Sequence, residues 1–587
     1  MKKKLIKISA LLMAFVIAGA PVAALADSSY TYNYDYWEEY QESPDIYTPV
    51  SVLTSTEIGL GVDAKNPSMS NPEGLYVNGD ELFVCDTGNN RILQYKRTSK
   101  ENLELVRIID RIEGAVPKIY VEGTETGSSE TTEDGENSDG ESAENVDGTT
   151  VEGTAEGETQ LTETAPAEEE VEEEPVAEEP AVTVDGEYNS LIQSEDWKNR
   201  DEHYFYKPTD FAVSADGNYF ISDSGNARIL KVDKNLNYIC QFLKPQDESL
   251  DKKLIFKPTK IAIDTAERVY CIASGINKGL VKFEPDATFS GFIGATPVTY
   301  DFWDWLYKKF ASAEKLALLP DFTPTEYSNV YMDHEGFVYT TASSISEEDL
   351  KSAASDPVRR LNLMGGDILI RNGNQPIYGD IYFGTGGGYT GPSRFADITV
   401  FENDVYAAVD RNRGRIFIYD DQGNLICAFG GGGNRDGYFG CAISIEHMGY
   451  DLIVLDQNNC NVTIFSLTEY GQQIFDAIDY FDHGDYDNSG MCWQNVKDMN
   501  GNCDLAYIGI GRSLLRQKRY KESMDYFEVK YDADNYSKAF KQYRKEWVEE
   551  NIATIVIVLV IVFAVPLLIG KLRSIKHEID VADIFNS

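Results

Sequence analysis

The stretch FYKPTDFAVSADGNYFISDSGNARILKVD, residues Phe205 to Asp233, recurs in recognisable form along this 587-residue chain. Clear copies lie at Asn71 to Lys96, Phe256 to Phe283 and Gly391 to Asp420, and weaker copies lie at Phe322 to Leu363 and Phe439 to Leu467. The sequence therefore predicts six repeats of one structural unit.

Each repeat contains short apolar runs separated by turn residues. In the quoted copy these runs are DFAV, YFISD and RILKV, and YICQFL follows soon afterwards. Four such runs with Gly, Asn and Asp between them are typical of an antiparallel sheet built from hairpins. One sheet alone leaves its faces in water, so repetition at this period favours radial packing into a propeller. We expect a mainly β fold in which residues 49–467 form a six-bladed β-propeller.

The chain's own beginning is predicted to close the ring. The last copy ends at Leu467 without an obvious fourth strand, while Pro49 to Thr54 (PVSVLT) precedes the first copy. We therefore expect Pro49 to Thr54 to form the outer strand of the sixth blade.

The repeat resembles the NHL repeat. The pattern P-x-x-[IVFL]-A-V, followed by Y-[IV]-x-D-[ST]-G-N-x-R-I, is clearest at Pro208 to Ile229 and Pro72 to Ile92. We interpret three Asp residues and the Arg that follows each of them as structural braces of the repeat: Asp86 with Arg91, Asp223 with Arg228, and Asp410 with Arg415.

The N-terminus has the features of an exported protein. Residues 1–26 carry four Lys, an apolar run and a terminal Ala24-Leu25-Ala26, which is the pattern of a cleaved signal peptide. The segment 27–48 then places Tyr at 30, 32, 34, 36 and 40. Alternating Tyr is consistent with a strand added to a sheet edge, with a ribbon that stacks on sugar rings, or with rings packed over the propeller's own side.

Two insertions interrupt the repeats. Residues 121–187 contain 24 Asp and Glu and no basic residue, so we expect a disordered acidic loop between the first two blades. Residues 301–319 (DFWDWLYKKFASAEKLALL) have apolar residues at helical spacing and predict an amphipathic helix that covers one mouth of the propeller or contacts a partner.

The C-terminal part is predicted to be helical and to end in a membrane anchor. Within 468–551 the chain repeats at a period of 34, and Tyr507 to Phe527 resembles the tetratricopeptide repeat, a platform for proteins or peptides. Residues 552–569 form an uncharged apolar run that just spans a bilayer. Acidic residues precede this transmembrane helix and Lys571, Arg573 and Lys576 follow it, so residues 570–587 are predicted to be cytoplasmic and the bulk of the chain extracellular.

Composition excludes some functions and leaves others open. The net charge of -45 argues against a nucleic-acid partner. Neither a catalytic set nor a metal or cofactor site is predicted, because His334 and His447 are expected at hairpin tips away from the channel and no convergent constellation is visible. Most of the eight cysteines occupy apolar strand positions, and Cys492 with Cys503 would be the local pair if disulfides form.

The inner strands offer charged residues at the start of each blade. Counted from the leading Pro of each repeat, these are Glu73, Asp210, Lys260, Glu326 and Arg394. We expect them to surround one mouth of the axial channel, where they either bind a small polar ligand such as a sugar or a peptide end, or simply neutralise one another around solvent.

The whole chain resembles membrane-anchored NHL-repeat proteins of Gram-positive bacteria. That resemblance implies a binding or scaffold role at the cell envelope, with glycan, peptide or protein ligands, and suggests a membrane complex for sugar transport as a partner. The alternative function is a propeller hydrolase or lyase, such as a lactonase, acting on an envelope or extracellular substrate.

Overall fold

The computed structural model describes residues 31–61, 66–117, 200–251, 253–295, 326–352, 355–384 and 391–586. The predicted signal peptide (1–26), acidic insertion (121–187) and inserted helix (301–319) all lie outside the described residues.

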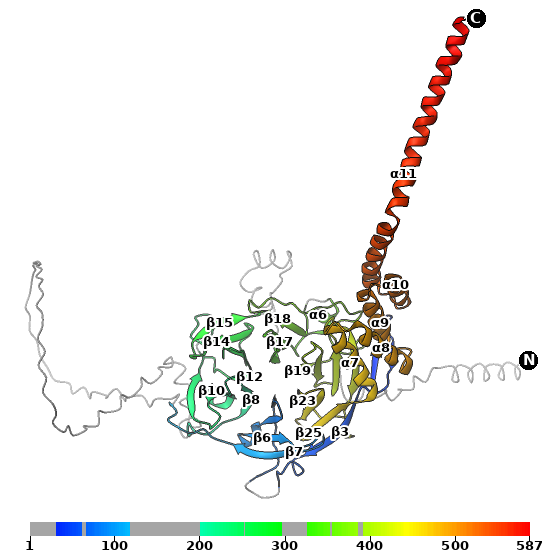
Figure 1. Ribbon diagram of the computed structural model, residues 1–587. Helices are drawn as coiled ribbons and strands as arrows, with labels where there is room; N and C mark the ends of the chain where they lie inside the picture. The colour runs from blue at the N-terminus through cyan, green and yellow to red at the C-terminus, as the bar shows by residue number, and fades with distance from the viewer. Residues whose placement is uncertain are drawn as a thin grey trace, which may run out of the picture. The chain divides into compact units, whose positions relative to one another are not determined.

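Six antiparallel sheets are arranged around a common axis, which confirms the predicted six-bladed propeller (Figure 1). Blade one contains β4 (Gly74–Asn78), β5 (Glu81–Asp86), β6 (Arg91–Arg97) and β7 (Leu103–Ile109). Blade two contains β8 (Pro208–Val213), β9 (Tyr219–Asp223), β10 (Arg228–Val232) and β11 (Tyr238–Phe242). Blade three contains β12 (Pro258–Ile263), β13 (Val269–Ala273), β14 (Leu280–Phe283) and β15 (Phe289–Ile293). Short 3-10 turns η1 (Thr87–Asn89) and η2 (Ser224–Asn226) join the second and third strands of blades one and two.

The other three blades depart from this plan. Blade four has three strands among the described residues, β16 (Asn329–Met332), β17 (Val338–Thr341) and β18 (Val358–Leu361), with helix α6 (Glu347–Lys351) between the last two. Blade five contains β19 (Phe395–Val400), β20 (Tyr406–Asp410), β21 (Arg415–Tyr419) and β22 (Leu425–Gly430), and its outer edge is extended by β1 (Thr31–Tyr34) and β2 (Tyr40–Glu42). Blade six contains β23 (Ala442–Met448), β24 (Asp451–Asp456) and β25 (Asn461–Leu467).

Strand β3 (Tyr47–Thr54) closes the ring as predicted. It pairs with β25 in antiparallel register, from Thr54 opposite Asn461 to Tyr47 opposite Leu467. The outer strand of blade six is therefore the N-terminal part of the chain, as the missing fourth strand of the last repeat indicated.

Apolar side chains fill the space between neighbouring blades. Phe83 of blade one and Phe211 of blade two stack with their ring centroids 4.3 Å apart, and both are buried. Because each strand presents alternate side chains to alternate faces, every blade contributes to the contacts on both of its sides. The core is thus a ring of interfaces between blades.

The predicted braces are present in blades one and two. Asp86 accepts a hydrogen bond from Arg91 Nε at 2.7 Å, and Asp223 accepts one from Arg228 Nε at 2.9 Å. In blade five the prediction is wrong for Asp410, because Arg415 pairs with Asp380 instead. Burial then raises the pKa of the Asp410 carboxyl above its ordinary value.

Asp380 anchors the Tyr-rich segment to blade five. This carboxylate, 1% exposed, pairs with Arg413 and Arg415 and accepts hydrogen bonds from the hydroxyls of Tyr32 and Tyr34. Both tyrosines are buried in β1, which adds to the edge of blade five beside β22. The edge-strand interpretation of this segment is therefore confirmed for residues 31–34.

Two helix pairs follow blade six, and residues 34 positions apart have the same roles in them. The helices are α7 (Glu469–Asp482), α8 (Tyr486–Met499), α9 (Asp504–Arg516) and α10 (Tyr520–Val529). The buried Ser489 hydroxyl donates to the Ala477 carbonyl, and the buried Ser523 hydroxyl donates to the Gly511 carbonyl, both at 2.8 Å. The predicted period of 34 is thus a structural repeat.

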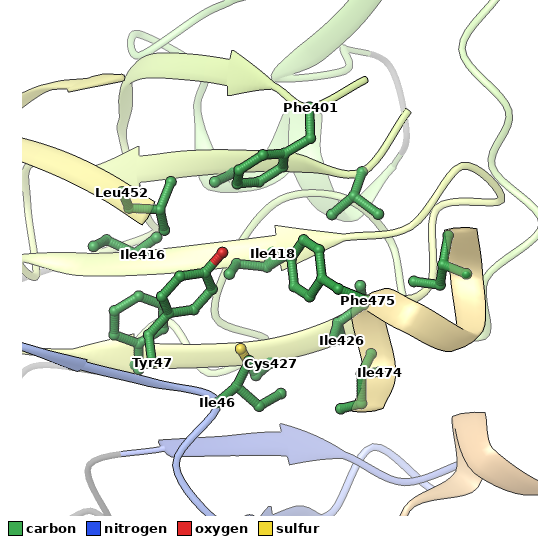
Figure 2. Packing of buried hydrophobic residues seen from close by; sticks show 14 of the residues in the cluster. Ile46, Tyr47, Phe401, Ile416, Ile418, Ile426, Cys427, Leu452, Ile474 and Phe475 are labelled. Carbon is green, nitrogen blue, oxygen red and sulfur yellow. The ribbon is translucent and has the colours of Figure 1, made fainter. Parts of the chain in front are cut away.

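Helix α7 packs against blades five and six through a shared apolar core. In Figure 2, Ile474 and Phe475 of α7 lie beside Ile418 and Ile426 of blade five. Tyr47 of β3 belongs to the same cluster, and its ring centroid is 6.1 Å from that of Phe475. The first helix of the repeat is therefore fixed to the propeller.

Helix α11 (Ala533–Asn586) continues from the helical repeat. It is long and apolar enough to cross a membrane, with a mean hydropathy of 3.3 in its most apolar stretch. All eight cysteines are free in the structure, and Cys85, Cys271, Cys427 and Cys503 are buried.

Candidate functional site

The innermost strand of each blade places one residue at the same level of the axial channel. In four blades a β-bulge immediately precedes this residue and sets its direction: Asp210, Lys260, Asp397 and Ser444. Asn329 of β16 and Gly74 of β4 occupy the matching positions of blades four and one. We call these six residues the channel ring.

Members of the channel ring connect each blade to the next. Asp210 Oδ2 accepts a hydrogen bond from the Ile261 backbone N–H of blade three at 2.8 Å. Asp397 accepts from the Ile445 N–H of blade six at 2.9 Å, and also from the side chains of Asn329 and Ser444. These polar groups are buried, and each such bond satisfies a backbone donor that water does not reach. The channel ring thus stabilises the propeller.

Lys260 and Asp210 form a buried ion pair in this ring. Lys260 Nζ lies 3.5 Å from Asp210 Oδ1 and 3.4 Å from the Glu73 carbonyl oxygen, and both side chains are at most 11% exposed. Burial raises the pKa of Asp210 to about 6, although Lys260 acts in the opposite direction. Burial lowers the pKa of Lys260, but the carboxylates of Asp210 and Asp397 raise it more, so the ammonium group stays charged.

Glu446 is another buried carboxyl group of the channel cavity. It lies on β23 two residues after Ser444 and is 8% exposed. Burial raises its pKa well above the ordinary value, and the carboxylates of Asp397 and Asp210 raise it further. Its hydrogen bond from the Thr399 hydroxyl is long, at 3.4 Å. Glu446 therefore keeps its proton to a higher pH than an exposed glutamate does.

Two cavities lie on the channel, and Lys260 lines both. The first has a volume of about 350 Å³, and its lining includes Tyr76, Asp210, Asn329, Tyr331, Asp397 and Glu446. The second has a volume of about 270 Å³, and its lining includes Glu73, Thr259, Ser274, Glu326 and Arg411. Carboxyl, amide, ammonium and phenol groups thus converge in the first cavity, which we call the channel cavity.

The five residues predicted from the sequence are only partly brought together. Asp210 and Lys260 are in contact, whereas Glu73 and Glu326 line the second cavity. Glu326 accepts a hydrogen bond from the Gly275 N–H at 3.0 Å. The side chain of Arg394 is exposed and lines neither cavity, so its predicted place in the channel is wrong.

The error at Arg394 comes from counting residues from the leading Pro. The segment before the inner strand differs in length between repeats, so the strand register places Asn329 and Asp397 in the ring instead. Aligning the apolar runs themselves, DFAV with DITV and NVYM, would have found both residues.

The structure bears out only part of what was predicted for the two histidines. His334 lies in the hairpin turn between β16 and β17, as predicted, but it lines the channel cavity instead of lying away from it. His447 lies within the inner strand β23 and not at a hairpin tip; its Nδ1 is 2.7 Å from the Thr399 hydroxyl, and burial lowers its pKa to about 4.

One carboxylate group in the described part of the chain is compact enough to hold a cation. Asp333, Glu335 and Asp404 bring their oxygens within 4.8 Å of one another. The guanidinium of Arg360 is paired with all three, at 2.7, 2.7 and 3.3 Å. The guanidinium of Arg360 thus already occupies the space between these carboxylates and offsets part of their charge.

Comparisons with known proteins give low likenesses to solved structures and one match to a family model. No curated protein matches the chain. A streptogramin B lyase structure is 10% identical over 68% of this chain and 94% of its own, with a TM-score of 0.31. Virginiamycin B lyase from Staphylococcus aureus is 9% identical over 70% and 97%, with a TM-score of 0.31. A protein of unknown function from Bacteroides thetaiotaomicron is 10% identical over 72% and 76%, with a TM-score of 0.36.

These three likenesses are too low to support any conclusion on activity or substrate. A family model gives the more specific result, because the NHL repeat matches residues 69–95. This range covers β4, β5 and most of β6. The chain therefore contains an NHL repeat in the first blade of its six-bladed propeller.

Proposed function

We propose that this protein is a binding and scaffold protein of the cell envelope, and that its channel cavity takes a small polar ligand such as a sugar or a peptide end. The observation that carries the proposal is the convergence of polar side chains from all six blades on a cavity of about 350 Å³. That volume lies in the range of small-molecule sites, which place a few oriented polar groups in a concave surface.

Two side chains of the cavity keep unused hydrogen-bonding capacity. Lys260 has three donors, and both of its contacts, at 3.5 and 3.4 Å, are longer than a strong charged hydrogen bond. Protonated Glu446 has a donor and acceptors but one long contact with Thr399. Tyr76 and Tyr331 add ring surface to the lining, which suits the apolar face of a sugar.

The envelope location is supported by the two ends of the chain. The first 26 residues have the pattern of a signal peptide, and α11 contains the apolar run at 552–569 with basic residues after it. In this proposal the propeller and the helical repeat lie outside the cell, and α11 anchors them in the membrane. The helical repeat docks a partner protein, for which a membrane transport complex is the candidate given by the family resemblance.

A ligand screen on matched variants tests the channel cavity. The full-length chain in detergent is titrated with sugars and short peptides by isothermal titration calorimetry, and Glu446→Ala is compared with Glu104→Ala. Glu104 is an exposed residue of β7 remote from the channel, so its variant is the control. A ligand that binds the wild type and the control but not Glu446→Ala supports the proposal. Equal binding by all three proteins contradicts it.

One observation favours an enzymatic alternative. Glu446 and Asp210 face the same cavity with raised pKa values, that of Asp210 being about 6, so one can donate and the other accept a proton near neutral pH. This is the arrangement that a hydrolase or lyase of lactones or glycans uses. Turnover of a bound ligand that disappears in both Glu446→Gln and Asp210→Asn would establish this alternative, while binding without turnover supports the scaffold.

A further inference from the structure

A groove of about 850 Å³ lies between blade five and the C-terminal helices. One wall consists of amide side chains from the propeller: Asn372, Asn374, Gln422 and Asn424. The opposite wall is formed by the side chains of α9, by the segment that joins α10 to α11, and by the start of α11. Asn372 and Gln422 are joined to each other by a backbone and a side-chain hydrogen bond, at 2.8 and 3.1 Å, which fixes the amide wall.

Basic side chains predominate in this groove, in contrast to the whole chain, which has 97 acidic and 52 basic residues. The basic members are Arg512, Arg516, Lys518 and Lys538, and we call the site the basic groove. The acidic members are Asp532 and Asp534. Both carboxylate oxygens of Asp532 already accept hydrogen bonds from Asn535, its backbone N–H and its side-chain amide, at 3.0 and 2.7 Å.

The basic side chains have few counter-charges of their own. Among ion pairs between described residues, none includes Arg512, Arg516, Lys518 or Lys538. Arg512 lies over the Phe481 ring, 4.6 Å from its centroid, and lowers the pKa of nearby Asp420 and Asp482 against the effect of burial. The other three are exposed at the groove and attract an anionic group.

Exposed aromatic rings lie at the same site. Tyr36 and Tyr531 line the groove, and Trp37 contacts both, with centroids 5.1 and 5.8 Å away. Trp37 is 67% exposed and Tyr531 is 60% exposed. Trp, Tyr and Arg are the residues that most often dominate binding energy in protein interfaces. We call these three rings the aromatic cluster.

The groove is close to the predicted membrane anchor. Lys538 and Gln542 of α11 line it, and the apolar run begins at Ile552 on the same unbroken helix. Ten helical residues span about 15 Å, so an occupant lies just outside the bilayer surface. This position suits an exposed segment of another membrane protein.

We propose that the basic groove and the aromatic cluster together bind an extended acidic peptide segment, bearing aromatic side chains, that belongs to a membrane-embedded partner. This inference deepens the scaffold part of the proposed function, on which it rests. Carboxylates of the segment pair with Arg516, Lys518 and Lys538, its backbone bonds to the amide wall, and its aromatic side chains pack on Trp37 and Tyr531. Peptide chemistry is favoured over lipid headgroups because an amide wall and exposed aromatic rings match a polypeptide.

The test uses a defined probe and the full-length chain. A fluorescein-labelled peptide that alternates Glu with Tyr and Gly is titrated with the protein in nanodiscs of neutral phosphatidylcholine, and fluorescence anisotropy gives the Kd. The double variant Arg516→Glu/Lys518→Glu is compared with Lys521→Glu/Lys541→Glu. The control residues are exposed on α10 and α11 but do not line the groove. A second probe carries Gln in place of Glu.

The proposal expects the groove double variant to weaken binding at least about tenfold, because close interfacial charge pairs contribute strongly. The control should stay within about twofold of the wild type, as exposed charges outside an interface contribute little. Binding should also weaken with salt and in Trp37→Ala. The proposal is overturned if both double variants bind alike, or if the Gln probe binds as tightly as the Glu probe.

Two further outcomes distinguish this proposal from lipid binding at the groove and from the proposed ligand site in the channel. Association of the wild-type chain with anionic phosphatidylglycerol vesicles that is lost in Arg516→Glu/Lys518→Glu, without binding of the Glu probe, would assign the groove to lipid headgroups and overturn the peptide proposal. Glu446→Gln should bind the probe as the wild type does. If the peptide probe binds the groove but no small ligand binds the channel cavity, the ligand-binding role proposed for the channel cavity is refuted and the groove proposal stands.

Discussion

The replacement of Asp223 by Asn should destabilise the propeller far more than the same replacement at Asp410. Asp223 accepts hydrogen bonds from Arg228 Nε, Asn226 Nδ2 and Tyr206 N at 2.8 to 2.9 Å, and Arg228 is 1% exposed. An asparagine would turn an amide N–H group toward the guanidinium and remove its counter-charge. Breaking one side of a buried ion pair costs about 3–5 kcal/mol.

Asp410 occupies the equivalent place in blade five but lacks the arginine. Its Oδ1 accepts from the backbone N–H groups of Arg394 and Asn412 at 2.8 Å, while Oδ2 is buried without a hydrogen-bond partner in the described part of the chain. Burial already raises the pKa of this carboxyl, so a neutral side chain fits the site better. We expect Asp410→Asn to cost less than about 1 kcal/mol.

Urea unfolding of the full-length variants, followed by circular dichroism, measures the difference between these two sites. Asp223→Asn should lower the unfolding midpoint clearly, and Asp410→Asn should leave it close to that of the wild type. Equal losses of stability in the two variants would refute the conclusion that Arg415 pairs with Asp380 and not with Asp410.

Three further predictions concern the channel, the helical repeat and the ring closure. Burial raises the pKa of Glu446 well above 4.5, so the folded chain holds a proton that the unfolded chain releases, and the stability of the wild type falls as pH rises from 4.5 through that raised pKa. Glu446→Gln should therefore gain stability relative to the wild type over this range. A constant difference between their urea midpoints across pH would contradict the raised pKa of Glu446. Gly509→Ala should cost about 1–3 kcal/mol, since its Cβ would lie 2.4 Å from the Trp493 ring, whereas Gly501→Ala, which points into open space, should be neutral in thermal unfolding. Leu53→Ala, at a 6% exposed position of β3, should cost about 2–5 kcal/mol and increase proteolysis of the N-terminal strand; unchanged cleavage would argue against closure by β3.

The parts of the fold that follow from local pattern could be predicted from the sequence. Turn residues between alternating apolar runs specify the blades, and the missing fourth run after Leu467 specified where Pro49 to Thr54 must lie. The period of 34 in the C-terminal part likewise appears as identical hydrogen bonds of Ser489 and Ser523. Such features depend on residues near one another in sequence or on a pattern that recurs several times along the chain.

Most of the channel depends on information that a repeat count does not contain. A bulge before Asp397 sets its direction. Arg394 was placed wrongly because Pro392 lies before β19, whereas Pro208 and Pro258 are the first residues of β8 and β12. Glu446 was missed because the residues around His447 were interpreted as a hairpin tip and not as part of the inner strand β23. Asp380 comes from a connection with no repeat partner, and only the tertiary structure brings Arg415 and Tyr32 to it.

The pairing of β3 with β25 also means that the propeller ring can close only after the last blade has been synthesised. Thr54 pairs with Asn461, and at 5–20 residues per second the ribosome needs roughly 20 to 80 seconds to make the roughly 400 residues between them. During that interval β3 has no partner strand, and the propeller ring of the nascent chain is open. A chaperone that binds β3 until the last blade has been synthesised would prevent β3 from pairing with another molecule. A chain truncated before Asn461 lacks β25, so its propeller ring cannot close through β3.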